Sequence, residues 1–195
     1  MSILVLTSDT LIGTPATGNL EYNGQFFGTD SNSSRAQLQR IVRATAVAST
    51  SGTSIDFTGI PAWVERITVM FSGVSGSGTS SLLVQLGTGS TTYTTSGYSA
   101  IGAFTDTAAN LVTSTAGFPI FQNSAGSAFS GTMTITNITG NTWVANHSGA
   151  NATGGYANNG GGNVALGAVL TAVRITRVNG TDTFDAGTVN IIYEG

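Results

Sequence analysis

The sequence predicts an all-β protein: an antiparallel β-sandwich of jelly-roll type with a short N-terminal hairpin and helix extension. Two observations support this class. Short runs rich in β-branched and aromatic residues recur between turn signals spaced about eight to twelve residues apart, and no strand–helix–strand spacing is present. A chain of 195 residues is long enough for one domain that buries a core, together with an extension.

Residues 1–48 are predicted to form a docking segment and a short stem. The first element is a hairpin in which Asn19–Tyr22 and Gln25–Phe27 flank Asn23-Gly24, because both residues of such a turn must accept positive φ. The apolar start, Met1–Leu6, lacks the basic region and cleavage site of a signal peptide. We expect it to be an edge strand or an anchor.

Residues 31–48 are the only helical candidate. Ser33 or Ser34 would cap this helix, and its apolar stripe recurs at spacings of three and four through Leu38, Ile41, Val42 and Thr45. A solitary helix with so short a stripe would be unstable. The stripe is therefore expected either to face two further copies in a trimeric stem or to lie on the main domain.

Residues 49–195 are predicted to form the main β-sandwich, or knob. Strands are expected near 54–58, 64–71, 81–87, 91–95, 131–138, 141–145, 164–178 with a break, and 188–194. Val64–Phe71 and Ser81–Leu86 are expected to form a hairpin, because the glycine-rich link Gly73–Gly78 suits a hairpin loop. Residues 99–116 suit a short helix or a long loop, and the Gly- and Asn-rich segment Asn146–Asn163 suits an exposed loop.

The composition of the chain argues against several classes of function. Charged residues make up 8% of the chain and lysine is absent, against roughly 25% charged residues in an ordinary domain; such a β surface favours a protein packed against copies of itself. The net charge of −3 argues against nucleic acid as a partner. No apolar stretch approaches the roughly 18 residues of a membrane span, and the absence of cysteine excludes disulfides and thiolate metal sites.

No catalytic residue, metal site or cofactor is predicted. His147 is the only histidine, and in its Gly- and Asn-rich surroundings it is expected to be a solvated loop residue rather than part of a triad. Asp182 and Asp185 could hold Ca²⁺, but turn formation is the preferred interpretation. Glu65, which lies beside Arg66 within a strand, is expected to form a cross-strand ion pair rather than to act as a general acid.

Because no catalytic or metal site is predicted, recognition of a receptor is the remaining candidate activity. Trp63 and Trp143 are expected in the core, which leaves Tyr156 as the best exposed aromatic. A polar loop that carries one aromatic on a rigid sandwich is a plausible recognition surface. The candidate receptor-binding residues are Tyr156, Asn158, Asn159 and His147.

Three segments carry a resemblance. TGIPAWVERITVMFSGVSGSGTSSLLVQLG, at 58–87, and RITRVNGTDTFDAGTVNIIYE, at 174–194, resemble the two ends of a domain that recurs in virion proteins of tailed bacteriophages, often tail fibres and other appendages. ATGNLEYNG, at 16–24, is similar to a short module near the start of many phage structural proteins. The resemblance spans most of the chain from about residue 50 onward.

The resemblance implies a structural protein on the virion surface, made in the host cytoplasm without a signal peptide. It implies a small homotrimeric fibre or appendage that docks to other virion proteins through residues 1–48 and binds a host-surface glycan or another receptor. A capsid decoration (cement) protein is the alternative. A polysaccharide-degrading enzyme is a minor one.

Overall fold

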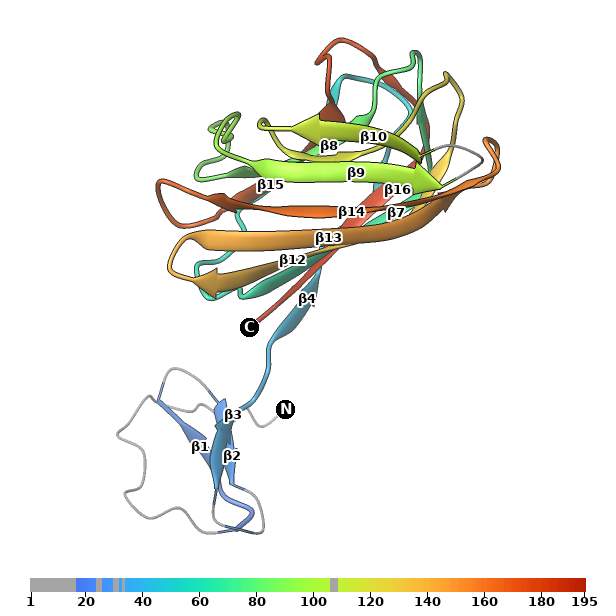
Figure 1. Cartoon of the computed structure of the whole chain (residues 1–195). Helices are drawn as coiled ribbons and strands as arrows, with labels where there is room; N and C mark the ends of the chain where they lie inside the picture. The colour runs from blue at the N-terminus through green and yellow to red at the C-terminus, as the bar shows by residue number, and fades with distance from the viewer. Residues whose placement is uncertain (1–16, 24–25, 30–31, 33, 106–108) are drawn as a thin grey trace. The chain divides into compact units, whose positions relative to one another are not determined.

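The structure is a computed structural model that describes residues 17–23, 26–29, 32, 34–105 and 109–195 (Figure 1). The chain divides into two compact units, residues 1–40 and 41–195. Throughout the described residues the regular elements are β-strands, and every strand pairing is antiparallel. The predicted all-β, antiparallel class is confirmed. Met1–Leu6 lies outside the described residues.

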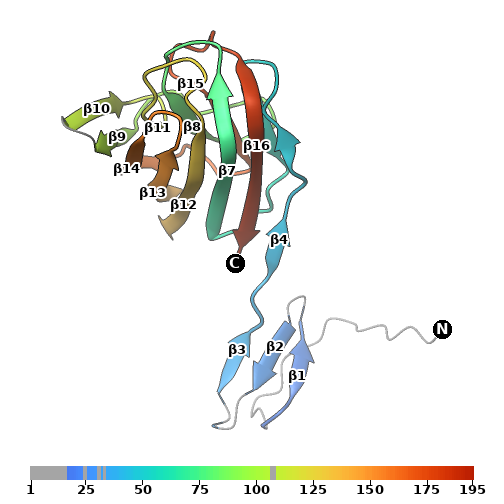
Figure 2. The same cartoon turned by 90° about the vertical axis from the view of Figure 1, so that its right-hand side faces the viewer.

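The first unit contains a three-stranded sheet of β1 (Leu20–Tyr22), β2 (Phe26–Thr29) and β3 (Arg35–Gln37), in that order (Figure 2). The pairing of β1 with β2 confirms the N-terminal hairpin, although Gly24 of its turn lies outside the described residues. Arg35 Nε donates to the buried carboxylate of Glu21 at 2.6 Å, which ties β3 to β1 across the sheet.

The predicted helix over residues 31–48 is wrong. This segment forms β3 and two further short strands, β4 (Ile41–Arg43) and β5 (Val47–Ala48). The physical reason is tertiary pairing: β3 bonds to β2, while β4 and β5 both bond to one strand near the C-terminus. Ser33, one of the two expected caps, lies outside the described residues.

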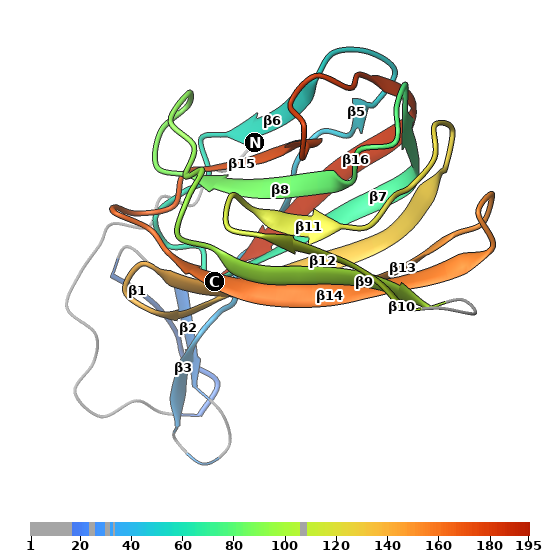
Figure 3. The same cartoon turned by 45° about the horizontal axis from the view of Figure 1, so that its top comes forward.

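The second unit is built from two sheets. The larger has nine strands: β10 (Ala109–Ser114), β9 (Ser99–Thr105), β14 (Tyr156–Ala165), β13 (Thr142–Asn151), β12 (Phe129–Thr139), β7 (Arg66–Gly76), β16 (Phe184–Glu194) and β4 in that order, with β5 also paired to β16. The smaller sheet contains β11 (Phe118–Ile120), β8 (Leu82–Gly87), β15 (Ala172–Arg177) and β6 (Ser54–Thr58), in that order. Figure 3 shows the smaller sheet lying over one face of the larger.

One hydrophobic core lies between these two sheets. It takes Ile67 and Val69 from β7, Ile135 from β12, Val84 from β8 and Ile175 from β15, all of them without exposed surface. Alternate residues of each strand point into this core, as period-two patterning requires. The packing of two sheets on one core is the β-sandwich arrangement that the sequence predicts.

The chain crosses repeatedly between the two sheets. With the hairpins β9–β10 and β13–β14 set aside, the larger sheet reads β5-β16-β7-β12 and the smaller reads β6-β15-β8-β11. Successive strands from β5 to β16 then alternate between the sheets, except that β8 and β11 both lie in the smaller sheet. The two hairpins extend the larger sheet beyond β12.

Strands lie close to the expected positions at 54–58, 64–71, 131–138, 141–145 and 188–194. The expected hairpin of Val64–Phe71 with Ser81–Leu86 is wrong, because β7 and β8 belong to different sheets. β8 instead lies between β11 and β15. Leu82, Leu83 and Val84 are all buried, since both faces of this strand are covered.

Three further expectations are corrected. Residues 91–95 form no strand; Tyr93 makes only an isolated bridge to Gly87. Residues 99–116, expected as a short helix or long loop, contain β9 and β10. Residues 146–163, expected as an exposed loop, contain the paired ends of β13 and β14.

Candidate functional site

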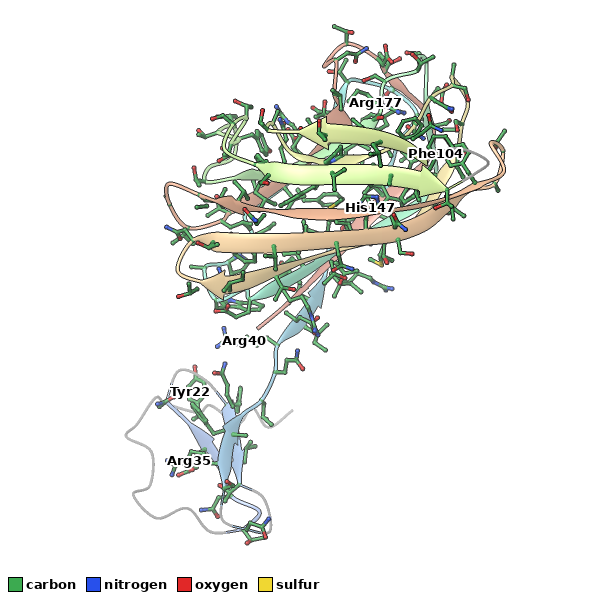
Figure 4. All side chains as sticks on the ribbon, viewed as in Figure 1. Tyr22, Arg35, Arg40, Phe104, His147 and Arg177 are labelled. Carbon is green, nitrogen blue, oxygen red and sulfur yellow. The ribbon has the colours of Figure 1, made fainter. Side chains whose placement is uncertain are left out.

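The segment predicted to bind a receptor is a long β-hairpin with one buried face. His147 on β13 and Tyr156 and Asn158 on β14 are 3%, 7% and 1% exposed, whereas Asn159 is exposed. The expectation of a solvated loop is therefore wrong for three of the four residues. Figure 4 shows His147 and Phe104 within the body of the second unit.

Glycines explain why this segment can be buried. A Cβ on Gly149 of β13 would lie 2.5 Å from ring atoms of Phe129, and one on Gly102 of β9 would lie 2.5 Å from the carbonyl oxygen of Pro119 in β11. The larger sheet therefore has glycines, which lack a side chain, where the Phe129 ring and strand β11 come close to its backbone. The Gly-rich composition reflects close packing rather than a loop.

Polar groups on this buried face are partly paired. Tyr156 Oη and Ser127 Oγ are 3.0 Å apart, and Asn158 Nδ2 donates to the carbonyl oxygen of Phe121 at 3.2 Å. His147 Nε2 has no hydrogen-bond partner, and burial lowers the pKa of His147 to about 4. His147 is therefore neutral at pH 7, packed edge-on against the ring of Phe129 at 6.5 Å.

The second unit also contains a buried arginine, Arg177, which the sequence analysis missed. Arg177 is 2% exposed; its Nη1 donates to the carbonyl oxygen of Ser80 at 3.1 Å and to Oε1 of Gln122. Its guanidinium lies over the ring of Phe184 at 5.2 Å. Burial lowers the pKa of Arg177. The alternation of β15 could have indicated it, because Val173, Ile175 and Arg177 share one face.

The two carboxylates considered for Ca²⁺ bind protein donors. Asp182 accepts the backbone N–H of Ser80 at 3.1 Å, and Asp185 accepts the hydroxyl of Ser75. A hydrogen bond from Asn179 is the main cause that lowers the pKa of Asp182. Among the described residues, no three or more His, Cys, Asp or Glu side chains gather where they could hold a metal ion.

The structure also bears on two other expectations, an ion pair on β7 and the burial of the two tryptophans. Arg66 forms its ion pair with Glu194 of the neighbouring strand β16, not with Glu65; adjacent residues on a strand point to opposite faces. Trp143 is buried at 3% exposure, and Trp63 packs half-buried against the core. The core assignment is confirmed for Trp143, whereas Trp63 lies at the margin of the core.

Apolar side chains are exposed along one edge of the larger sheet. We call residues 41–48, which contain β4 and β5, the edge segment. Among the described strands, β4 and β5 pair only with β16. Ile41 is 64% exposed, Val42 38% and Val47 37%. Leu38, the third predicted stem residue, belongs to the first unit and is 49% exposed. An unpaired edge that carries exposed apolar residues is a template for association.

The outer face of the larger sheet is poor in charge. Strand register places small polar side chains side by side on this face: Thr132, Thr134, Thr136, Asn146, Ser148, Asn159 and Asn163. Where charge does occur on β7, Arg66 is neutralised by Glu194. The face therefore offers many neutral hydrogen-bonding groups and few charges.

Comparisons with known proteins returned no family model, curated protein or solved structure that matches the chain. Within the part of the chain that the structure describes, no helix has the length and apolar character needed to cross a membrane.

Proposed function

We propose that this protein is a non-enzymatic structural component of a tailed-phage virion: a small homotrimeric fibre or appendage protein exposed on the particle surface. In this proposal, residues 1–48 dock to other virion proteins and the knob faces the host, where it binds a surface glycan or another receptor. The sequence resemblance supports the virion assignment. The exposed edge segment is the structural observation that supports the proposed homotrimer.

The edge segment favours self-association for two reasons. First, full burial of an aliphatic side chain contributes about 1.5–3 kcal/mol. Ile41, Val42 and Val47 are 64%, 38% and 37% exposed, so association could still bury a third or more of the surface of each. Second, Arg43 is the only charged side chain in the edge segment, so little desolvation cost opposes contact. Three copies that bury this edge around one axis would each gain several kcal/mol.

The test is analytical ultracentrifugation of the full chain and two variants at the same concentration. Wild-type protein should sediment as a trimer. The double variant Ile41→Glu/Val47→Glu should sediment as a folded monomer, because it places charge in the buried edge. Leu111→Glu is the matched control: Leu111 is 59% exposed on β10, at the opposite edge of the same sheet, and the variant should stay trimeric. A trimer that tolerates the double variant would remove the edge segment as its source.

The capsid decoration role is the second candidate. The observation that favours it is the first unit, in which Leu20 and Phe26 are 63% and 43% exposed. These apolar side chains could bind the protein lattice of a capsid. Antibody labelling of intact particles viewed by electron microscopy separates the two roles. Label over the tail or its attachments supports the appendage, and label spread over the head supports the decoration protein.

A further inference from the structure

An open pocket lies on the outward face of the smaller sheet. Its volume is 310 Å³, within the roughly 300–1,000 Å³ of pockets that hold small ligands. Strands β6, β15 and β8 contribute its floor, and the turn that follows β15 contributes one wall. Its principal lining residues are Ser54, Gln85, Arg174, Thr176, Val178 and Asn179.

Strand register shows which side chains face this pocket. Val173 and Ile175 of β15 belong to the core and have no exposed surface, so Arg174 between them points to the outward face. Arg174 is paired with Asp56 of β6 and with Gln85 of β8, and residues directly opposite each other share a face. Asp56, Arg174 and Gln85 therefore form one row across the outward face.

The guanidinium of Arg174 is held in a fixed position within this row. Its Nε and Nη2 donate to the two carboxylate oxygens of Asp56 at 2.8 and 2.7 Å, and its Cζ lies 4.0 Å from the centre of the Tyr93 ring. A guanidinium has five N–H donors, and Asp56 takes two of them. The side chain is 31% exposed and lines the pocket, so a bound molecule can reach the remaining donors.

Gln85 places an acceptor beside these donors. Its Nε2 donates to the carbonyl oxygen of Ala116 at 2.9 Å, which orients the amide and leaves Oε1 to accept. Among the described residues, Oε1 has no hydrogen-bond donor, and it is not among the fully covered atoms without a partner. Opposite residues on antiparallel strands have Cβ atoms about 4.5–5.5 Å apart. One hydroxyl group can therefore accept from Arg174 and donate to Gln85.

The other features of the pocket limit the class of ligand. Asp56 neutralises Arg174, so the pair gives no net attraction for an anion. Val178, which is 47% exposed, adds an apolar wall. β15 and β8 are each paired on both sides, so their backbone groups cannot pair with the added strand of an extended peptide. A neutral ring that carries hydroxyl groups suits all of these features.

We propose that this pocket binds one neutral sugar residue of a saccharide, through a hydroxyl group that accepts from Arg174 and donates to Gln85. The inference rests on the proposed function, because it names the class of receptor that the knob would recognise and the place where it binds. It assigns recognition to the outward face of the smaller sheet rather than to the hairpin that carries Tyr156.

The test is a titration of deuterated, ¹⁵N-labelled full-length protein, followed through its backbone amide signals by NMR. Methyl glycosides of glucose, galactose, mannose and N-acetylglucosamine are added separately, with the methyl glycoside of glucuronate as the anionic comparison. At least one neutral sugar should shift the signals of Ser54, Gln85 and Arg174 saturably, while the signals of β12 and β13 in the larger sheet stay in place. The glucuronate glycoside should bind more weakly.

Two arginine variants locate the binding. Arg174→Met removes the guanidinium donors and should weaken the best sugar about tenfold or more, as the loss of a hydrogen bond from a charged group predicts. Arg66→Met is the matched control, because Arg66 is also a partly exposed strand arginine paired with a carboxylate of the neighbouring strand, but it lies in the larger sheet. It should leave affinity unchanged.

Three results would overturn the proposal: pocket signals that no neutral sugar moves at tens of millimolar, an equal loss of affinity in both variants, or a glucuronate glycoside that binds more tightly than every neutral sugar. The wild-type titration decides the question by itself if Arg174→Met does not fold.

These outcomes are separable from those of the proposed function. Saturable shifts at the pocket of a monomeric protein would keep the sugar site and remove the trimer. A trimer without any shift would keep the assembly and remove the sugar site.

Discussion

Between pH 6.5 and pH 5, acid should destabilise this protein mainly through His147, its only histidine. Burial lowers the pKa of His147 from 6.5 to about 4. Well above pH 6.5, at about pH 7.5 and higher, the imidazole is neutral in both folded and unfolded chains, so it contributes almost no pH dependence there. As the pH falls below 6.5 the unfolded chain binds a proton that the folded chain resists, and stability is lost.

The size of this effect follows from the pKa difference. Each pKa unit corresponds to about 1.36 kcal/mol. The linkage relation then gives a loss of about 2 kcal/mol at pH 5 and about 3 kcal/mol at pH 4, relative to pH 7.5. Such a loss is a large fraction of the total stability of about 5–15 kcal/mol for a typical domain. Most Asp and Glu carboxylates titrate below this window, so the interval from pH 6.5 to 5 isolates His147.

The assay is urea unfolding at fixed protein concentration at pH 7.5, 6.5, 5.75 and 5, since association would otherwise change the apparent stability. Wild-type protein should lose stability progressively below pH 6.5. His147→Gln cannot titrate and should show a nearly flat profile over the same interval, whatever its absolute stability. A flat wild-type profile, or an equal slope in the variant, would refute the assignment of a buried neutral imidazole.

Two further predictions concern packing, both measured by urea unfolding at pH 7.5. Gly149→Ala should destabilise the protein by about 1–3 kcal/mol, because the new Cβ would lie 2.5 Å from the Phe129 ring and 2.5 Å from a backbone oxygen. Gly167→Ala is the control: its Cβ would enter open space, and it should change stability by less than about 0.5 kcal/mol. Equal effects of the two substitutions would contradict the close packing at Gly149. Gln122→Leu removes the side-chain acceptor of the buried Arg177 and should cost about 1–3 kcal/mol; an unchanged midpoint would mean that Arg177 finds another partner.

The fold class was predictable from the sequence because period-two runs such as Ile67 to Phe71 are local signals of a half-buried strand. Which strands pair is a different question, decided by residues far apart in the chain. β7 and β8 follow one another in sequence but join different sheets. The adjacent buried residues Leu82, Leu83 and Val84 already indicated a strand covered on both faces, and a hairpin with one solvated face did not suit them.

The two largest errors have the same cause. The segment from Asn146 to Asn163 has loop composition, yet its pairing between β13 and β14 runs without a break through ten successive positions. Within the segment, Gly149 leaves room for the ring of Phe129, a contact that no local pattern reveals. The helix expected over residues 31–48 had suitable spacing, but pairing with β2 and β16 outweighed it.

The candidate site could be predicted only in part. Trp143 was expected in the core, and it is buried. The row of Asp56, Arg174 and Gln85 depends on how β6, β15 and β8 pair, which sequence spacing does not encode. Tyr156 was chosen because it lies among glycines, and those same glycines allow it to be buried.

We propose that this chain is a low-copy structural protein of a tailed-phage particle. Quantitative mass spectrometry of purified virions, with the major capsid protein as internal standard, tests it most directly. We expect the chain at a few dozen copies or fewer per particle, in a multiple of three. Its absence from purified particles would contradict the virion assignment, and hundreds of copies per particle would contradict the appendage in favour of capsid decoration.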